Sequence, residues 1–171
     1  NENLATEIGY NSAGKITDFD VSHDGKKIAF VSRGRMFVSD ITGKFIKEMP
    51  TDRGERVQEV RWMKDNESLL YTRTVKGWAN LFTINASAPA AEKQITRYER
   101  TLQNLLVSPD GDKALVNSGD SYIDLIDLKN FNVTGIIKDE FWFRPTQPRF
   151  SPDSRYILYA AHRTFEKDIF I

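Results

Sequence analysis

Four basic residues recur at one place relative to a spaced set of aspartates, and together they could bind an anion. The aspartates are Asp24, Asp65, Asp110 and Asp153, and a basic residue lies nine or ten positions before each. These basic residues are Lys15, Arg56, Arg100 and Arg144. Brought to one end of the molecule, they would form a cationic collar for a peptide's C-terminal carboxylate or for acidic side chains, because arginine presents paired donors in fixed geometry. Ordinary surface cations are the alternative interpretation.

A second recurring set is polar and lies six residues before each aspartate. Its members are Asp18, Glu59, Asn104 and Gln147. Such residues would face or flank a water-filled channel if the segments that carry them surround one. Simple solvation and contact with a ligand both stay open as interpretations of this set.

No pattern of residues indicates catalysis. The sequence contains no Gly-x-Ser-x-Gly, no phosphate-binding glycine-rich loop and no His-Glu-x-x-His. His23 and His162 have no companion at a metal-ligand spacing, and Ser22, Ser108 and Ser151 recur as turn formers without a base. We therefore expect a non-catalytic chain with no metal and no cofactor.

The composition narrows the choice of partners. The 171 residues balance 24 Lys and Arg against 24 Asp and Glu, which gives no electrostatic reason to expect nucleic acid as a partner. No apolar run approaches the ~20 residues that span a bilayer, so no membrane insertion is expected. The chain has no cysteine, which leaves the redox compartment open.

The elements that must position these residues follow from an internal repeat. The four aspartates are 41, 45 and 43 residues apart, and each lies in a turn, as in Ser108-Pro109-Asp110-Gly111. Ser at the first position, Pro at the second and Gly at the fourth suit a type I turn that closes a hairpin on a left-handed residue. Asn66 is the next best tolerated residue at that fourth position, and Ser154 is a poorer one.

Strands of matching type surround each turn. After the aspartates come the apolar triplets 28–30, 69–71, 114–116 and 157–159, which predict central strands buried on both faces. Third strands are expected at 35–38, 80–84, 122–126 and 168–171, and outer strands at 45–47, 93–95 and 135–137. Periods of 40 to 45 residues with several short strands are typical of propeller blades.

The predicted fold is therefore all-β: a β-propeller of about four blades, each with four antiparallel strands. We expect repeat units at about 15–49, 50–97, 98–138 and 139–171, the last one incomplete, after an N-terminal segment of residues 1–14. An edge left in mid-blade is unfavourable, so the blades are expected to belong to a larger propeller of six or seven blades. Alternatively, residues 1–10 supply the missing strand and close a four-bladed ring.

The repeat resembles that of TolB-type propellers and, more narrowly, that of the N-terminal propeller of tricorn-type serine proteases. The resemblance rests on residues 24–34, on 150–159 and on the segment from Arg53 to Trp62. It implies a module that gates or channels peptides to a separate catalytic domain, with the remaining blades and that domain as partners and the parent protein a serine-type peptidase. No catalytic residue of such a domain matches a position here.

A protein-binding propeller without an enzyme domain, as in TolB, is the alternative function. Localisation follows the same comparison: a periplasmic or exported protein is expected, with a cytoplasmic one as the alternative. Trp78, Trp142 and Phe143 fall in predicted loops that could reach across a propeller face. Packing between blades or against a further domain is the alternative interpretation.

Overall fold

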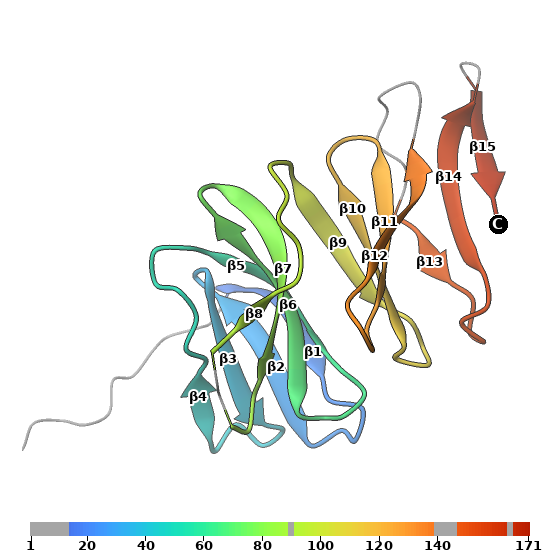
Figure 1. The fold of residues 1–171 in the computed structure, drawn as a ribbon. Helices are drawn as coiled ribbons and strands as arrows, with labels where there is room; N and C mark the ends of the chain where they lie inside the picture. Colours follow the sequence, from blue (N-terminus) through green and yellow to red (C-terminus); the bar gives the residue numbers. More distant parts are fainter. Residues whose placement is uncertain (1–13, 89–90, 139–146, 164–165) are drawn as a thin grey trace, which may run out of the picture.

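All regular secondary structure in the described part of the chain is β-strand, arranged in four antiparallel sheets (Figure 1). The computed structural model describes residues 14–88, 91–138, 147–163 and 166–171. Residues 1–10, the candidate ring-closing segment, together with Trp142, Phe143 and Arg144, lie outside these ranges.

Each sheet follows the chain from its first strand to its last. The strands of the first sheet are β1 (Ile16–Val21), β2 (Lys27–Ser32), β3 (Arg35–Asp40) and β4 (Ile46–Glu48). Those of the second are β5 (Val57–Trp62), β6 (Ser68–Val75), β7 (Trp78–Asn85) and β8 (Lys93–Gln94). Those of the third are β9 (Leu102–Val107), β10 (Lys113–Ser118), β11 (Tyr122–Asp127) and β12 (Val133–Lys138). Those of the fourth are β13 (Arg149–Phe150), β14 (Ile157–Arg163) and β15 (Glu166–Phe170).

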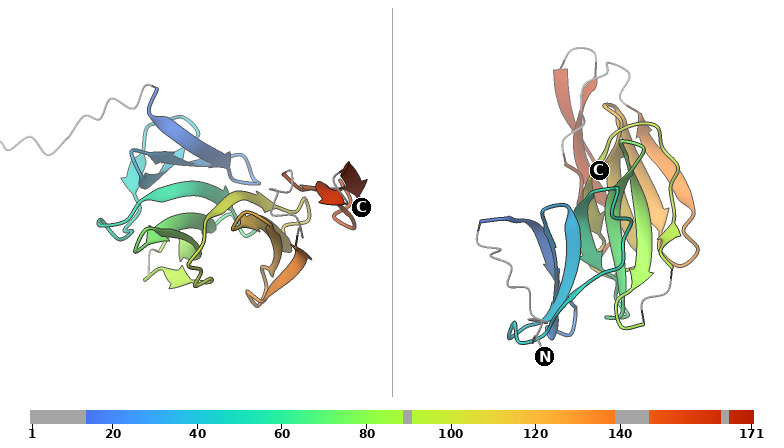
Figure 2. Two further views of the ribbon diagram at one scale, coloured as in Figure 1. Left: turned by 90° about the horizontal axis from the view of Figure 1, so that it is seen from above. Right: turned by 90° about the vertical axis from the view of Figure 1, so that its left-hand side faces the viewer.

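The four sheets follow one another round an open arc (Figure 2), as blades of a propeller do. The first strands of successive sheets lie side by side, β1 against β5 and β5 against β9. The predicted fold is thus confirmed as an all-β partial propeller. We refer to the sheets as blades 1 to 4.

The hairpin turns adopt the predicted conformation. Gly25, Asn66, Gly111 and Ser154 have φ angles of 70°, 56°, 71° and 60°, in the left-handed region. The serine hydroxyls bond locally, since Ser22 Oγ and Ser108 Oγ each accept from a backbone N–H five residues later at 2.9 Å.

The two non-glycine residues at the fourth turn position form hydrogen bonds to the neighbouring blade, which the sequence did not predict. Asn66 Oδ1 accepts a hydrogen bond from the Asp24 N–H at 3.0 Å, and Ser154 Oγ accepts one from the Asp110 N–H at 3.0 Å. Each side chain therefore joins its own turn to the turn of the preceding blade, which offsets the cost of the strained conformation.

Two apolar clusters fill the spaces between blades 1 and 2 and between blades 2 and 3. The triplets 69–71 and 114–116 are buried on both faces, as predicted. In blade 4 that prediction is wrong, because Leu158 is 45% exposed. Among the described residues no further sheet covers this face of blade 4.

The outer face of blade 1 is also uncovered, although its residues match a buried face. Phe19 lies five residues before Asp24, as Val60 does before Asp65. Phe19 is 60% exposed, whereas Val60 is fully buried against blade 1. The equivalents Val21 and Trp62 differ in the same way. Blade 1 therefore presents an apolar surface of the kind that packs against a neighbouring blade elsewhere in the arc.

Candidate functional site

The polar set on the innermost strands ties each blade to the next. Asp18 Oδ2 accepts a hydrogen bond from the Val60 N–H at 2.8 Å and one from the Arg61 guanidinium at 2.6 Å. Glu59 Oε1 accepts one from the Leu105 N–H at 3.1 Å. These side chains thus contribute to blade packing, a role beyond the solvation considered from the sequence.

The ties continue into the third and fourth blades. Asn104 Oδ1 accepts a hydrogen bond from Gln147 Nε2 at 2.6 Å. All four members of the polar set therefore take part in one line of contacts along the innermost strands. Asp20, which the sequence analysis did not single out, adds a parallel contact by accepting from the Trp62 N–H at 2.7 Å.

Bulges in the innermost strands set the direction of these side chains. The pairing of β1 with β2 shifts between Ile16 and Asp18, and that of β5 with β6 shifts between Val57 and Glu59. In blade 3 the irregularity falls opposite Asn104, whose φ is 61°. A bulge inserts one residue and re-aims its neighbours, so the acidic side chains can reach the next blade.

Burial changes the acidity of two of these groups. Desolvation raises the pKa of Glu59 above its ordinary value, because the hydrogen bond from the Leu105 N–H and the charge of Arg61 offset it only in part. Glu59 Oε2 is buried and has no partner among the described residues. Desolvation also raises the pKa of Asp20.

Three collar residues lie in the described ranges: Lys15, Arg56 and Arg100. Each precedes an innermost strand, but their surroundings differ. The Arg100 guanidinium lies 3.2 Å from Asp124 Oδ2 and stacks over the rings of Tyr98 and Tyr122 at 4.4 and 4.6 Å. Asp124 is buried and also accepts a hydrogen bond from the Tyr98 hydroxyl at 2.7 Å. Arg100 is therefore engaged within blade 3, which leaves it less available to a ligand.

Lys15 and Arg56 are exposed, and Arg56 lies against Gly34 of the neighbouring blade. A Cβ at Gly34 would approach the Arg56 side chain to 3.2 Å, and the φ of Gly34 is 78°. Glycine is therefore needed at this position on two grounds. The Val57 N–H donates to the Gly34 carbonyl at 2.9 Å, which fixes the start of β5 beside the β2–β3 hairpin.

Arg56 belongs to a basic hollow that we call the arginine depression. Its volume is about 340 Å³, and it lies between the β2–β3 hairpin of blade 1 and the segment that leads into β5. Four arginines line it: Arg33, Arg35, Arg53 and Arg56. Arg35 pairs with Glu48 at 3.1 Å, whereas the other three form no ion pair with any residue in the described ranges.

The acidic residues of the arginine depression bond to other groups. Asp52 Oδ1 accepts a hydrogen bond from the Gly54 N–H at 2.9 Å, and Glu55 Oε1 accepts one from the Lys76 N–H at 2.7 Å. A hydrogen bond from the Thr74 hydroxyl lowers the pKa of Glu55. The hollow keeps a small excess of positive charge, since four arginines face the three carboxylates of Glu48, Asp52 and Glu55. The three guanidinium groups that have no ion pair among the described residues can attract an anion.

Arg33 and Arg53 were not among the predicted site residues. The sequence signal for Arg33 was its place beside Gly34, in the loop between the predicted strands 28–30 and 35–38. Its φ of 53°, which an arginine rarely adopts, is evident only from the structure. Arg53 lies in the segment before β5 that carried part of the family resemblance.

The site thus lies on a β-propeller, and the fold is shared with solved propellers of known type. The crystal structure of the tricorn protease matches this chain with a TM-score of 0.75 at 22% identity, over 92% of this chain and 15% of that one. A putative TolB from Agrobacterium tumefaciens matches with a TM-score of 0.66 at 18% identity, over 90% of this chain and 56% of that one. TolB from Acinetobacter baumannii matches with a TM-score of 0.65 at 18% identity, over 90% of this chain and 40% of that one.

These likenesses confirm the resemblance to tricorn and TolB propellers at the level of the fold. The chain spans about a seventh of the tricorn protease and roughly half of each TolB chain. No protein-family model matches the sequence, and no curated protein does. No helix in the described ranges is long and apolar enough to cross a membrane.

Proposed function

We propose that this chain is a non-catalytic propeller module of a tricorn-like serine protease, which admits acidic peptides or peptide C-termini toward a separate catalytic domain. The observation that carries this proposal is the arginine depression. Three unpaired arginines line a hollow at the end of the blades where the innermost strands begin. Guanidinium groups bind carboxylates with paired hydrogen bonds, and this favours an anionic peptide as the ligand.

The uncovered faces support the presence of further blades in the parent protein. Phe19 on blade 1 and Leu158 on blade 4 are exposed at positions whose equivalents are buried inside the arc. Apolar surface of this kind is covered in most folded proteins. A parent propeller of six or seven blades would cover both faces. Export of that parent is proposed from the likeness to TolB propellers, and cell fractionation of the parent tests it.

Peptide binding is tested by charge reversal in the 171-residue chain. Arg53→Glu combined with Arg56→Glu should weaken binding of an acidic peptide at least about tenfold, because two charge-assisted contacts are replaced by repulsion. Lys93→Glu combined with Lys138→Glu is the matched control, since both lysines are exposed and neither lines the arginine depression. Equal binding by both double variants would reject the proposed peptide site.

A TolB-like protein-binding propeller is the second candidate, because the TolB likenesses cover 90% of this chain. Peptidase activity of the full-length parent separates the two candidates. Activity in the parent, with none in the isolated chain, supports the gating module. A parent that binds a folded protein and cleaves no peptide supports the TolB-like function.

A further inference from the structure

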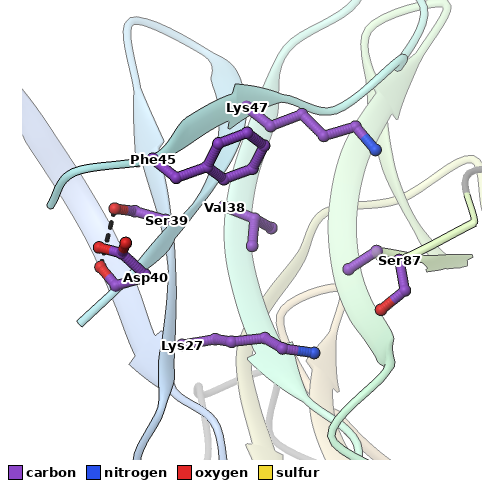
Figure 3. Close-up of a pocket in the computed structure, with 8 residues that line it drawn as sticks. Lys27, Val38, Ser39, Asp40, Phe45, Lys47 and Ser87 are labelled. Carbon is purple, nitrogen blue, oxygen red and sulfur yellow. Dashed lines mark hydrogen bonds between the residues drawn. The ribbon is translucent and has the colours of Figure 1, made fainter. Parts of the chain in front are cut away.

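A second hollow lies toward the opposite end of blade 1 from the arginine depression, between strands β2 to β4 of blade 1 and the segment that follows β7 in blade 2 (Figure 3). Its volume is about 280 Å³. The residues that matter for its chemistry are Lys27, Val38, Phe45, Lys47, Ala86 and Ser87. We call it the lysine cleft. Lys27 begins β2 just after the first turn, whereas Gly34, against which Arg56 of blade 2 packs, lies at the other end of blade 1.

The lysine cleft carries two ammonium groups and no acidic partner for them. The side chains of Lys27 and Lys47 extend on either side of Val38 toward the segment that holds Ser87 (Figure 3). Neither lysine forms an ion pair with a residue in the described ranges. Lys27 Nζ donates to the Asn66 carbonyl at 3.0 Å, which fixes its position and leaves further donors free.

The one carboxylate beside the lysine cleft is already occupied. Asp40 Oδ1 accepts hydrogen bonds from the Thr42 hydroxyl at 2.9 Å and from the Lys44 N–H at 3.0 Å. It therefore stabilises the β3–β4 hairpin, and its single charge offsets only one of the two lysine charges. The cleft keeps a net positive charge beside its apolar walls.

One wall offers an apolar surface to a ligand. Phe45 is 61% exposed and borders the lysine cleft together with the buried side chains of Val38 and Ala86. Phe45 and Lys47 extend from the same face of the β4 segment, because residues two apart in a strand share a face. The Phe45 ring and the Lys47 side chain thus both border the lysine cleft.

We propose that the lysine cleft binds a peptide segment in which a carboxylate side chain neighbours an apolar one. The carboxylate would lie between the Lys27 and Lys47 ammonium groups, and the apolar side chain would cover Phe45. The volume is below the range typical of drug-sized ligands, so it suits one or two side chains of an extended segment. A small inorganic anion would use the lysines but not Phe45.

The test is an NMR titration of the 171-residue chain with the blocked peptide acetyl-Leu-Glu-Leu-amide. Expected are saturable shifts at the backbone amides of Val38, Phe45, Lys47 and Ser87, with at least about fivefold weaker binding of acetyl-Leu-Gln-Leu-amide. Equal binding of both peptides, or the absence of shifts at these amides, would overturn the proposal. If inorganic phosphate displaced the peptide at an equal concentration, the proposal would be overturned as well, because the cleft would then bind any anion regardless of its apolar neighbour.

Matched variants separate the cleft from nearby surface. Lys47→Gln and Phe45→Ala should each weaken peptide binding about fivefold or more, whereas Lys44→Gln and Ile46→Ala should leave it unchanged. Lys44 and Ile46 belong to the same hairpin but do not line the cleft. The proposal would be contradicted if Lys47→Gln and Lys44→Gln weakened binding equally, or if Phe45→Ala and Ile46→Ala did. Because Arg53 and Arg56 lie at the other end of the blades, failure here leaves the proposed function untouched, and the reverse also holds.

Discussion

The backbone N–H of Leu105 donates a hydrogen bond to Glu59 Oε1 across 3.1 Å, and this contact joins the innermost strands of blades 2 and 3. The other oxygen of the same carboxylate is buried without a partner among the described residues. Glu59 therefore combines a useful acceptor with a costly buried charge. The two effects can be separated experimentally, because glutamine keeps the acceptor and removes the charge.

We predict that Glu59→Gln stabilises the chain at neutral pH by about 1 kcal/mol. Desolvation raises the folded-state pKa of Glu59 above 4.5, so the folded state holds the proton more tightly than the unfolded state. The wild-type free energy of unfolding should therefore fall as pH rises through that raised pKa. Urea unfolding between pH 4 and pH 8 measures both effects.

The Glu59→Gln variant should keep part of this pH dependence, because the pKa of Asp20 is also raised by burial. The free energy of unfolding of the variant should change less with pH than that of the wild type. The two free energies of unfolding should converge at acid pH. A variant less stable than the wild type at pH 7 would show that the Glu59 charge is favourable where it lies.

Removing the charge of Asp18 should destabilise the chain, in contrast to Glu59→Gln, because the Asp18 carboxylate is paired with Arg61. Asp18→Asn weakens the contacts with the Val60 N–H and the Arg61 guanidinium, and we expect a loss of about 1–3 kcal/mol. Asp112→Asn is the control, because Asp112 also links blades, through Lys64, but its ion pairs with Lys64 and Lys129 are exposed. That change should cost clearly less than Asp18→Asn, because solvent screens an exposed ion pair. Chemical unfolding of both variants at pH 7 gives the comparison, and equal losses would contradict the special role of Asp18.

The turn of blade 2 offers a test of the contact between turns. Asn66→Ala removes the hydrogen bond to the Asp24 N–H and places alanine at a φ of 56°, so we expect a loss of about 2 kcal/mol. Asn66→Gly keeps the conformation and removes only the hydrogen bond, and it should cost about half as much. Thermal unfolding of both variants checks the order. If both variants lost the same stability, the left-handed backbone conformation at residue 66 would contribute nothing to the loss.

The repeat made the fold predictable from sequence, whereas the contacts between repeats were not. Turn positions and the apolar triplets depend on local chemistry, so Gly25 and residues 69–71 fell where expected. The partners of Asp18 and Glu59 depend on how far one blade is offset from the next, and bulges set that offset. Arg100 was assigned to a collar from its spacing before Asp110, and its pairing with Asp124 was not foreseen because the two residues are 24 positions apart in sequence.

The uncovered face of blade 1 gives the final prediction. Phe19→Ser should change the stability of the 171-residue chain by less than about 0.5 kcal/mol, because Phe19 is exposed there. Val60→Ser, at the equivalent buried position, should cost about 3 kcal/mol or more. If a further blade covers Phe19 in the parent protein, the same Phe19→Ser change should destabilise the parent by a comparable amount. Unfolding of the wild type and both variants in each protein makes the test, and a parent indifferent to Phe19→Ser would show that no blade packs on this face.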